Sequence, residues 1–388
     1  MNIVFLSPHF PSHYHQFCRQ LKTVGANVLG IGDQVYEHLL PEVRDALHEY
    51  YRVEDMHDYD ALVRACGYFT HRYGKIDRFE SLNEYWLGTE ARIRDDFNIF
   101  GIRLREIDAV RRKSRMKEVF RQAAVPVARG RVVTDLTDAR TLIAEIGYPV
   151  VLKPDAGVGA LNTCRIENDG DLVAALNGGS PVDLIAEEFI TGDLFSFDGL
   201  VDRDGRLIFY TAHTFSQGIM ETVNEDRHVF YCSLRHIPVD LERVGRASVA
   251  AFGLRERFFH IEFFKTAGDR YIALEVNMRP PGGYTTDMFN YANDIDIYRA
   301  WAELLVQGGA PLTFERRYHC CYASRKHRHR YRHTHDEIMS RYGHVMQEVV
   351  KVPGVFSSAL GDIGYIFRSP EMEEITTVVE FIHALESE

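Results

Sequence analysis

The chain has 388 residues, of which 45% are hydrophobic and 26% are charged. This length and composition predict a globular protein of two or three domains and exclude a disordered, collagen-like or coiled-coil chain. The formal net charge of −11 argues against a general nucleic-acid binder, because such proteins carry a broad basic surface.

The sequence shows no sign of a membrane or secreted protein. No apolar run approaches the ~18 residues that a membrane helix needs, and residues 1–8 lack the basic flank and the length of a signal peptide. The six cysteines are scattered without a CxxC pair, which favours reduced thiols over a disulfide framework or a zinc site. We therefore expect a cytoplasmic protein without a membrane partner.

The first part of the chain reads as strand, helix, strand. Apolar runs at residues 3–6 and 26–32 flank a helical pattern that includes Phe17 and Leu21. This spacing predicts a βαβ unit and a parallel sheet. Because no GxGxxG follows the first run, an NAD-type dinucleotide site is not indicated. Residues 56–120 read as mostly helical.

Beyond Pro126, short apolar strands alternate with short helices, as in an α/β protein. The pair Asp204 and Gly205 predicts a hairpin turn. Helices are expected at about 295–306 and at 371–385. Strands are expected at residues 131–134, 148–153, 184–189, 195–201, 258–265 and 271–277.

A lysine and a loop of small residues follow one of these strands. The strand at 148–153 ends in Lys153, and the loop at 155–160 contains Gly157 and Gly159. A cationic lysine beside exposed backbone N–H groups suits phosphate oxygens. The Walker pattern GxxxxGK[ST] is absent, so the segment is either a phosphate site of another kind or an ordinary strand end with a flexible turn.

The strands at 258–265 and 271–277 are expected to form an antiparallel hairpin. If the connecting loop is 267–270, residue 266 pairs with residue 271, so Glu262 faces Glu275 and His260 faces Asn277. Facing carboxylates repel each other, and a divalent cation such as Mg²⁺ relieves that repulsion. Because Arg279 and the loop at 280–283 follow at once in the chain, we favour a Mg²⁺ site here over a hairpin whose polar face is simply solvated.

A third segment, residues 184–193, is an apolar strand that carries Glu187 and Glu188 and ends in a turn. Such an edge can offer backbone groups to a purine and a carboxylate to ribose hydroxyls. Taken alone, it reads as an ordinary strand end.

In this order the segments resemble the ATP-grasp superfamily, in particular its carboxylate–amine ligases, over residues 108–310. The resemblance implies two catalytic residues, Lys153 and Arg279. It implies Mg²⁺, replaceable by Mn²⁺, on three ligands: Glu262, Glu275 and Asn277. The residues that it implies for ATP binding are Lys113, Lys153, Gly157, Gly159, Glu187, Glu188, Phe189, Ile190 and Asp193.

Within that set the resemblance implies distinct roles. Lys113 and Lys153 would contact the phosphates, and the loop at 155–160 would cover them. Residues 187–190 correspond to the edge that pairs with adenine, and Asp193 corresponds to the ribose contact.

The resemblance also implies a domain plan. An N-terminal α/β domain, called pre-ATP-grasp in that family, would cover residues 1–108. A two-lobed ATP-grasp domain would cover 109–312, with a lid lobe at about 115–190 and a catalytic lobe at about 191–312. A C-terminal α/β appendage would cover 313–388.

The implied reaction is activation of a carboxylate by the γ-phosphate of ATP, followed by attack of an amine and release of ADP and phosphate. Amino acids or peptide-like molecules are the expected substrates, no nucleic-acid partner is expected, and a homodimer is left open. The alternatives are bicarbonate activation of the biotin-carboxylase type and a regulatory protein that binds ATP without turnover.

A basic run at residues 325–335 contains four histidines and five arginine or lysine residues. Alternating cations would repel a divalent metal, and a nucleic-acid site needs a broad basic face with stacking aromatics. We expect a solvated or interdomain segment, with contact to an anionic substrate or nucleotide as the alternative.

Acidic side chains of the N-terminal domain offer a further possibility. Glu80 and Glu84, taken as one helical turn apart, can approach an acceptor amine, although a solvated helix face is the simpler interpretation. His9, His13 and His15 follow the first strand, where open parallel sheets often place ligand-binding residues, but ordinary surface or hydrogen-bonded side chains are the favoured reading.

Overall fold

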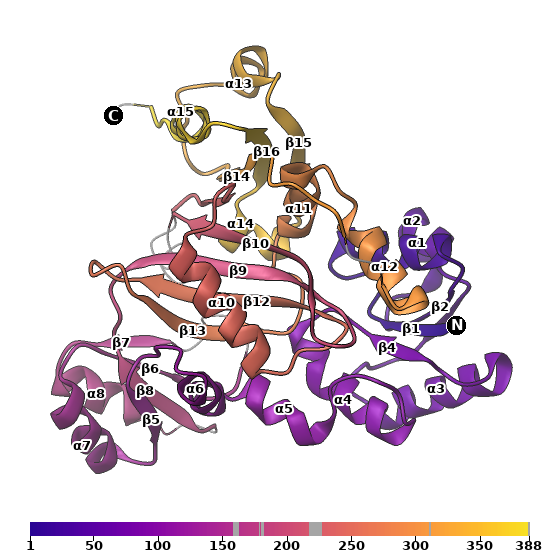
Figure 1. The fold of residues 1–388 in the computed structure, drawn as a ribbon, viewed down its shortest axis with the longest axis horizontal. Coiled ribbons are helices and arrows are strands. Elements are labelled where there is room, and N and C mark those ends of the chain that lie inside the picture. Colours follow the sequence, from indigo (N-terminus) through magenta and orange to yellow (C-terminus); the bar gives the residue numbers. More distant parts are fainter. Residues whose placement is uncertain (158–162, 178, 180–181, 217–226, 310–311, 387–388) are drawn as a thin grey trace.

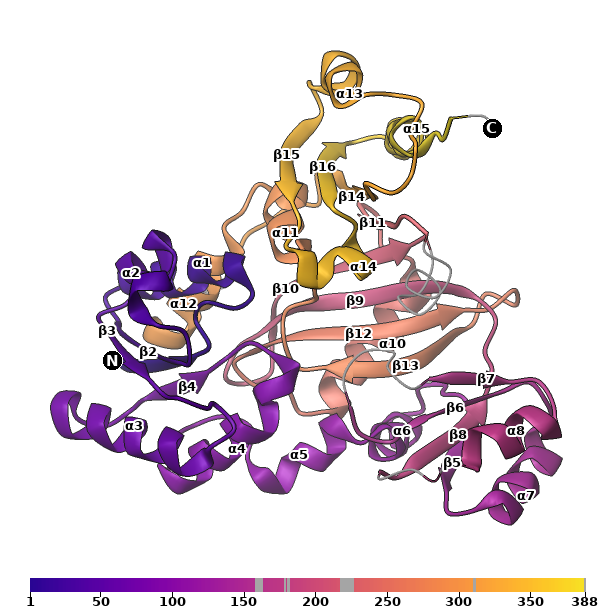
Figure 2. The same cartoon turned by 180° about the vertical axis from the view of Figure 1, so that it is seen from behind.

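The computed structural model of the chain describes residues 1–157, 163–177, 179, 182–216, 227–309 and 312–386 (Figure 1). Its strands form three sheets. In both views an N-terminal sheet and a small second sheet lie at opposite sides of a long central sheet (Figure 2). No helix in the described part of the chain is long and apolar enough to cross a membrane.

The N-terminal sheet is parallel, with strand order β3-β2-β1-β4. The predicted βαβ unit is confirmed, because β1 and β2 pair in parallel and α1 lies between them in the chain. The strands are β1 (Asn2–Leu6), β2 (Asn27–Gly32), β3 (Glu49–Arg52) and β4 (Arg78–Glu80). The helices are η1 (Ser12–Tyr14), α1 (His15–Thr23), η2 (Tyr36–His38), α2 (Pro41–Ala46), α3 (Tyr59–Tyr73), η3 (Glu84–Trp86), α4 (Leu87–Asp96) and α5 (Leu104–Arg111).

The second sheet is antiparallel, with strand order β5-β8-β6-β7. Its apolar residues pack against α7 and α8 in one small core. The strands are β5 (Gly130–Val133), β6 (Val150–Pro154), β7 (Cys164–Ile166) and β8 (Leu184–Glu188), and the helices are α6 (Lys113–Gln122), α7 (Leu136–Ile146) and α8 (Asp169–Leu176).

The central sheet is antiparallel, with strand order β13-β12-β9-β10-β11-β14-β16-β15. The predicted turn at Asp204 and Gly205 is confirmed, with Gly205 at a φ of 82°. The strands are β9 (Asp193–Val201), β10 (Leu207–Phe215), β11 (Phe230–Ser233), β12 (Arg257–Lys265), β13 (Tyr271–Asn277), β14 (His319–Arg325), β15 (Met346–Lys351) and β16 (Ile363–Ser369). The helices are α10 (Val239–Ala251), α11 (Thr285–Asn293), α12 (Ile297–Gln307), α13 (His335–Tyr342), η4 (Gly354–Phe356), α14 (Ser357–Leu360) and α15 (Met372–His383).

The C-terminal strands continue the central sheet. β14 pairs with β11, so strands on both sides of residue 312 share one sheet. The expected domain boundaries near 108 and 312 stay a prediction, but the C-terminal region forms no sheet separate from the central one in the described residues.

A buried ion network joins the N-terminal region to the central sheet. Arg257 of β12 lies 3.3 Å from Glu80 and 2.9 Å from Glu90. Its Nε donates a hydrogen bond to the Met278 carbonyl at 2.5 Å. Because buried charges are tolerated only when they are paired, this network holds the end of β13 against the N-terminal region.

Glu80 and Glu84 are not one helical turn apart, so that expectation is wrong. Glu80 ends strand β4 and is buried in the ion network, whereas Glu84 begins η3. The stretch 56–120 therefore contains a short buried strand that its helical pattern hides.

The basic run at 325–335 ties the C-terminal elements together. Arg325 is buried, and its guanidinium donates to the carbonyls of Ile382 (2.7 Å) and His333 (2.6 Å). The described residues contain no group of three or more His, Cys, Asp or Glu side chains placed to hold a metal ion. The run thus has a structural role within the C-terminal region.

Candidate functional site

The β12–β13 hairpin places two carboxylates opposite each other. Glu262 pairs with Glu275 and His260 with Asn277, as predicted. The pairing predicted next to the turn of this hairpin is wrong by one residue, because Lys265 rather than residue 266 pairs with Tyr271. A bulge between Glu262 and Phe263 shifts the register by one and restores the facing pair.

A chain of buried polar groups lies beneath Glu262. His260 contacts Asp198 through Nδ1 and Glu262 through Nε2, the latter at 3.0 Å. Asp198 also accepts hydrogen bonds from His213 (2.7 Å) and Ser196 (2.6 Å). Burial alone would lower the pKa of His260, but the Asp198 carboxylate raises it to about 9. A protonated His260 therefore donates to both carboxylates and orients Glu262.

Two lysines share one buried carboxylate at the edge of the second sheet. Glu187 of β8 forms ion pairs with Lys153 of β6 and with Lys117 of α6, the latter at 2.7 Å. Two ammonium groups and one carboxylate leave an excess positive charge, which suits a phosphate. Lys117 was not among the predicted residues, although its i, i+4 spacing from Lys113 places both on one face of a helix.

Glu187 was expected on the edge that pairs with adenine, and its side chain does not fit that role. It is 3% exposed and is held between the two lysines. Only its backbone remains available for a base, since the carboxylate is the counter-ion of the lysines.

The acid stability of the chain should depend on Glu187. Burial alone would raise its pKa above the ordinary 4.5, but the two ammonium groups lower it to about 2. Because folding lowers this pKa, the ionised Glu187 carboxylate stabilises the folded state by about 3 kcal/mol. This contribution is present above pH ~4.5 and is lost as the pH falls toward 2. Urea unfolding from pH 5 to 2 should therefore show a shallower loss of unfolding free energy in Glu187→Gln than in wild type. Equal slopes would contradict this account.

Lys113 is brought to Lys153 by a link between α6 and the small-residue loop. The Asp155 carboxylate accepts hydrogen bonds from the backbone N–H (2.7 Å) and the hydroxyl (2.9 Å) of Ser114, at the start of α6. Lys113 Nζ then lies 3.4 Å from the Gly157 carbonyl and 3.8 Å from Glu275. Gly159, the other predicted loop residue, lies outside the described residues.

A cavity of about 360 Å³ separates the second sheet from the hairpin, and we name it the inter-lobe cavity. Its wall contains most of the residues expected to hold ATP. Among the described residues there are two exceptions: the exposed side chain of Asp193 is not part of this wall, and Gly157 lines the central cavity described below instead. The residues that line the cavity are Lys113, Lys117, Ala128, Val151, Lys153, Thr163, Glu187, Glu188, Phe189, Ile190, Thr191, Gly192, Leu194, Glu262, Phe264, Ile272, Ala273, Leu274 and Glu275.

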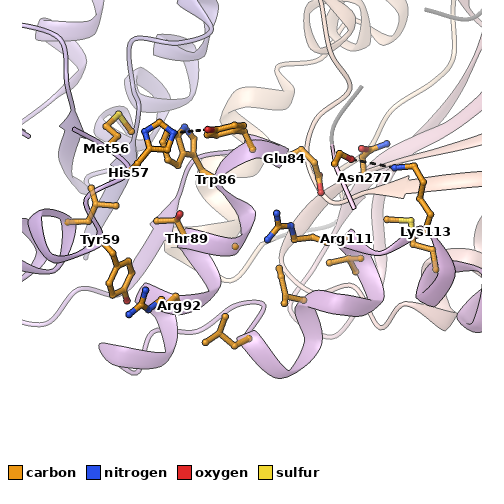
Figure 3. Close-up of a pocket in the computed structure, with 18 of the residues that line it drawn as sticks. Met56, His57, Tyr59, Glu84, Trp86, Thr89, Arg92, Arg111, Lys113 and Asn277 are labelled. Atoms are coloured by element: carbon orange, nitrogen blue, oxygen red, sulfur yellow. Dashed lines mark hydrogen bonds between the residues drawn. The ribbon is translucent and has the colours of Figure 1, made fainter. Parts of the chain in front are cut away.

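A second, central cavity of about 560 Å³ adjoins the first, because Lys113 and Glu275 line both (Figure 3). It extends from Asn277 into the N-terminal region. The residues that line it are Met56, His57, Tyr59, Leu62, Glu84, Tyr85, Trp86, Gly88, Thr89, Arg92, Leu104, Ile107, Val110, Arg111, Lys113, Met116, Gly157, Glu275 and Asn277.

A third cavity, of about 260 Å³ and rich in aromatic side chains, shares Glu84 and Tyr85 with the central one. We name it the aromatic cavity. Its lining includes the predicted Arg279, as well as His13 from the group after the first strand. Arg279 donates hydrogen bonds to the Pro280 carbonyl at 2.8 Å and to Asn277 Oδ1 at 3.5 Å.

Glu84 lies where the central cavity and the aromatic cavity meet. Burial raises its pKa to about 7, although Arg279 and Arg257 act in the opposite direction. Its Oε2 is buried and, in the described part of the chain, has no hydrogen-bond partner. An unpartnered buried carboxylate between two cavities is available to a ligand.

The oxygens of Glu262, Glu275 and Asn277 fit a magnesium ion. The two carboxylates face each other across the ladder, and each keeps part of its side chain exposed, at 16% and 27%. Mg²⁺ commonly binds a few carboxylates and completes its coordination shell with water and phosphate. The small number of protein oxygens here, with a cavity beside them, matches that pattern. The chemistry of this donor set thus agrees with the predicted ligands.

Comparison with known proteins relates part of this chain to a domain family. Residues 146–287 match the family model of the ATP-grasp domain. An L-arginine-specific L-amino acid ligase of Bacillus subtilis is 25% identical over 252 residues, which cover 62% of this chain and 60% of that protein. A D-alanine–D-alanine ligase of Acinetobacter baumannii is 31% identical over 90 residues, or 23% of this chain and 29% of that enzyme.

Fold comparison covers more of the chain. The crystal structure of an L-amino acid ligase from Bacillus licheniformis matches with a TM-score of 0.76 over 98% of this chain and 96% of that chain, at 14% identity. The sequence matches are shorter, since they span 60% and 29% of the two relatives named above. Residues 146–287 therefore match the ATP-grasp domain, and the fold of nearly the whole chain is similar to that of an L-amino acid ligase of known structure.

Proposed function

We propose that this protein is an ATP- and Mg²⁺-dependent ligase that joins a carboxylate to an amine and releases ADP and phosphate. Amino acids or peptide-like molecules are the expected substrates, in the cytoplasm, and Mn²⁺ is expected to replace Mg²⁺. The relatives with amino acid ligase names support this substrate class.

The observation that carries the proposal is that the inter-lobe cavity adjoins the central cavity. Lys113 and Glu275 line both the inter-lobe and the central cavity, so a triphosphate in the first would present its terminal phosphate to a substrate in the second. With about 560 Å³, the central cavity is in the usual range for a small-molecule site.

The residues of the chain would act mainly by binding and by neutralising charge. A magnesium ion on Glu262, Glu275 and Asn277 supplies charge neutralisation at the phosphates. Lys113 and Lys153 hold phosphate oxygens. One carboxylate oxygen of the substrate attacks the γ-phosphorus, the bond to the bridging oxygen breaks, and ADP leaves with the electron pair.

The second step joins the amine. Its nitrogen attacks the carbonyl carbon of the acyl phosphate, the C–N bond forms, phosphate leaves with the electron pair of the C–O bond, and the nitrogen loses a proton to water. Arg279 would stabilise the oxyanion of the tetrahedral intermediate. A closed site is needed, because water would otherwise hydrolyse the acyl phosphate.

The experiment is an ATP-dependent hydroxamate assay over single amino acids, paired with a phosphate-release screen of amino-acid pairs. Hydroxylamine traps an acyl phosphate, so we expect a hydroxamate with the correct carboxylate and an equal amount of ADP. ADP formation that depends on bicarbonate alone would indicate the carboxylase alternative. Thermal stabilisation by ATP without any ADP would indicate a regulatory binder.

A further inference from the structure

The junction between α5 and α6 presents three consecutive cations, Arg111, Arg112 and Lys113, to the site. Arg112 is 2.9 Å from Asp183, and Lys113 is 3.8 Å from Glu275. Among the residues that the structure describes, no hydrogen bond or ion pair joins the Arg111 side chain to another group. One of the three cations is therefore available to a ligand.

The guanidinium of Arg111 lies in the wall of the central cavity. A Cβ atom at Gly88, in the first turn of α4, would lie 2.6 Å from Nη1 of Arg111. The guanidinium thus lies across α4 at a point where the helix has no side chain. Figure 3 shows Arg111 on the cavity wall with Thr89 on one side and with Asn277 and Lys113 on the other.

Other basic side chains of this cavity are already engaged. His57 contacts Tyr85 at 2.6 Å and Asp55 at 3.0 Å, and the Arg92 guanidinium lies 3.5 Å from the centre of the Tyr59 ring. Arg111 is therefore the cation with the clearest capacity to pair with an incoming anion.

An amino acid that acts as the nucleophile carries a carboxylate of its own. That group must be paired, because the cavity wall already contains the carboxylates of Glu84 and Glu275. It must also be held away from the γ-phosphate. Arg279 contacts Asn277 at 3.5 Å, and Asn277 lines the central cavity beside Glu275, where the triphosphate would enter. The carboxylate to be activated would therefore lie near Arg279 and the free one near Arg111, so each would have its own arginine.

We propose that Arg111 binds the free carboxylate of the amine substrate, which makes α-amino acids or peptides with a free C-terminus the nucleophiles, in preference to simple amines. This rests on the proposed ligase function. A guanidinium suits the task because it binds carboxylates in a bidentate, charge-assisted manner.

The test compares three nucleophiles in wild type and Arg111→Met: an amino acid accepted in the pair screen, its α-carboxamide, and hydroxylamine. We expect the KM for the amino acid to rise by about 10- to 100-fold in the variant. The carboxamide and hydroxylamine lack the carboxylate, so their rates should stay within about twofold. Wild type should bind the amino acid more tightly than the carboxamide by a similar factor.

Two further variants complete the test: one shifts the position of the Arg111 guanidinium without changing its charge, and the other is a control. Gly88→Ala should push the guanidinium aside without removing its charge, so a smaller rise in the same KM is expected. Arg105→Met, on the same helix but outside the cavity lining, is the matched control and should behave like wild type. Thermal melting checks the fold of each variant.

The possible outcomes separate this inference from the proposed function. Without any hydroxamate in the wild type, the ligase function is wrong and the role of Arg111 is overturned with it. With a hydroxamate in the wild type, an unchanged KM in Arg111→Met overturns only the role of Arg111. Equal losses with all three nucleophiles would also overturn it, because Arg111 would then act on the phosphates or on the first carboxylate.

Discussion

Replacing Glu275 by glutamine is expected to lower the rate of ADP formation by about 100- to 1,000-fold. The substitution keeps the shape of the side chain but removes one of the two facing carboxylates, and with it a charged metal ligand. The same change should raise the dissociation constant of Mn²⁺ measured by electron paramagnetic resonance in the presence of ADP.

The stability of Glu275→Gln should change in the opposite direction from its activity. Without metal, Glu262 and Glu275 repel each other across the ladder, so the variant should melt at the same temperature as wild type or slightly higher. The rise in melting temperature on adding Mg²⁺ and ATP should shrink. Asp269→Asn, at the exposed tip of the same hairpin, is the matched control. Wild-type activity in Glu275→Gln would refute the metal assignment.

Lys153→Met is expected to lower kcat/KM for ATP by about 100- to 1,000-fold. The methionine fills similar space but supplies no charge to the phosphates. It also leaves Glu187 with Lys117 as its partner, so the cluster formed by Glu187 and its lysines loses its excess positive charge. Calorimetric titration with ATP should show weaker binding, which separates this variant from one that affects only the chemical step.

Two companion variants sharpen the Lys153 experiment. Lys265→Met removes a lysine at the far end of β12, where it pairs with Asp269, and should leave ATP turnover unchanged. Lys153→Arg keeps the charge and should recover part of the binding but less of the turnover, since a guanidinium cannot occupy the position of an ammonium group. Full activity in Lys153→Met would show that Lys153 does not contact the phosphates.

Much of the site could be predicted because it depends on strand periodicity. Side chains alternate along β12 and β13, so Glu262, Glu275 and Asn277 were expected near one another from their spacing alone. The prediction was less secure than it looked. The turn register was wrong by one residue, and the bulge beside Glu262, for which the sequence offers no clear sign, corrected the error.

Other side chains depend on neighbours distant in the chain. The strand edge at Glu187 was expected to offer backbone groups to adenine, which stays a prediction, but nothing local indicated that two lysines from α6 and β6 neutralise its carboxylate. Lys117 was missed because nothing local distinguishes it from other lysines of a basic helix. Asp193 ends outside the cavity wall, since it begins β9 with its side chain exposed.

The succession of strands along the chain, the common face of Glu275 and Asn277 and the lysine before the small-residue loop follow from the amino-acid sequence by itself, because they depend on periodicity and turn chemistry over a few residues. The tertiary structure alone decided how the cavities join. Asp155 binds the start of α6, Glu84 lies between two cavities, and Arg111 has no acidic partner among the residues that the structure describes. These features depend on contacts between residues far apart in the chain, where burial and charge pairing, rather than local preference, determine what each side chain can do.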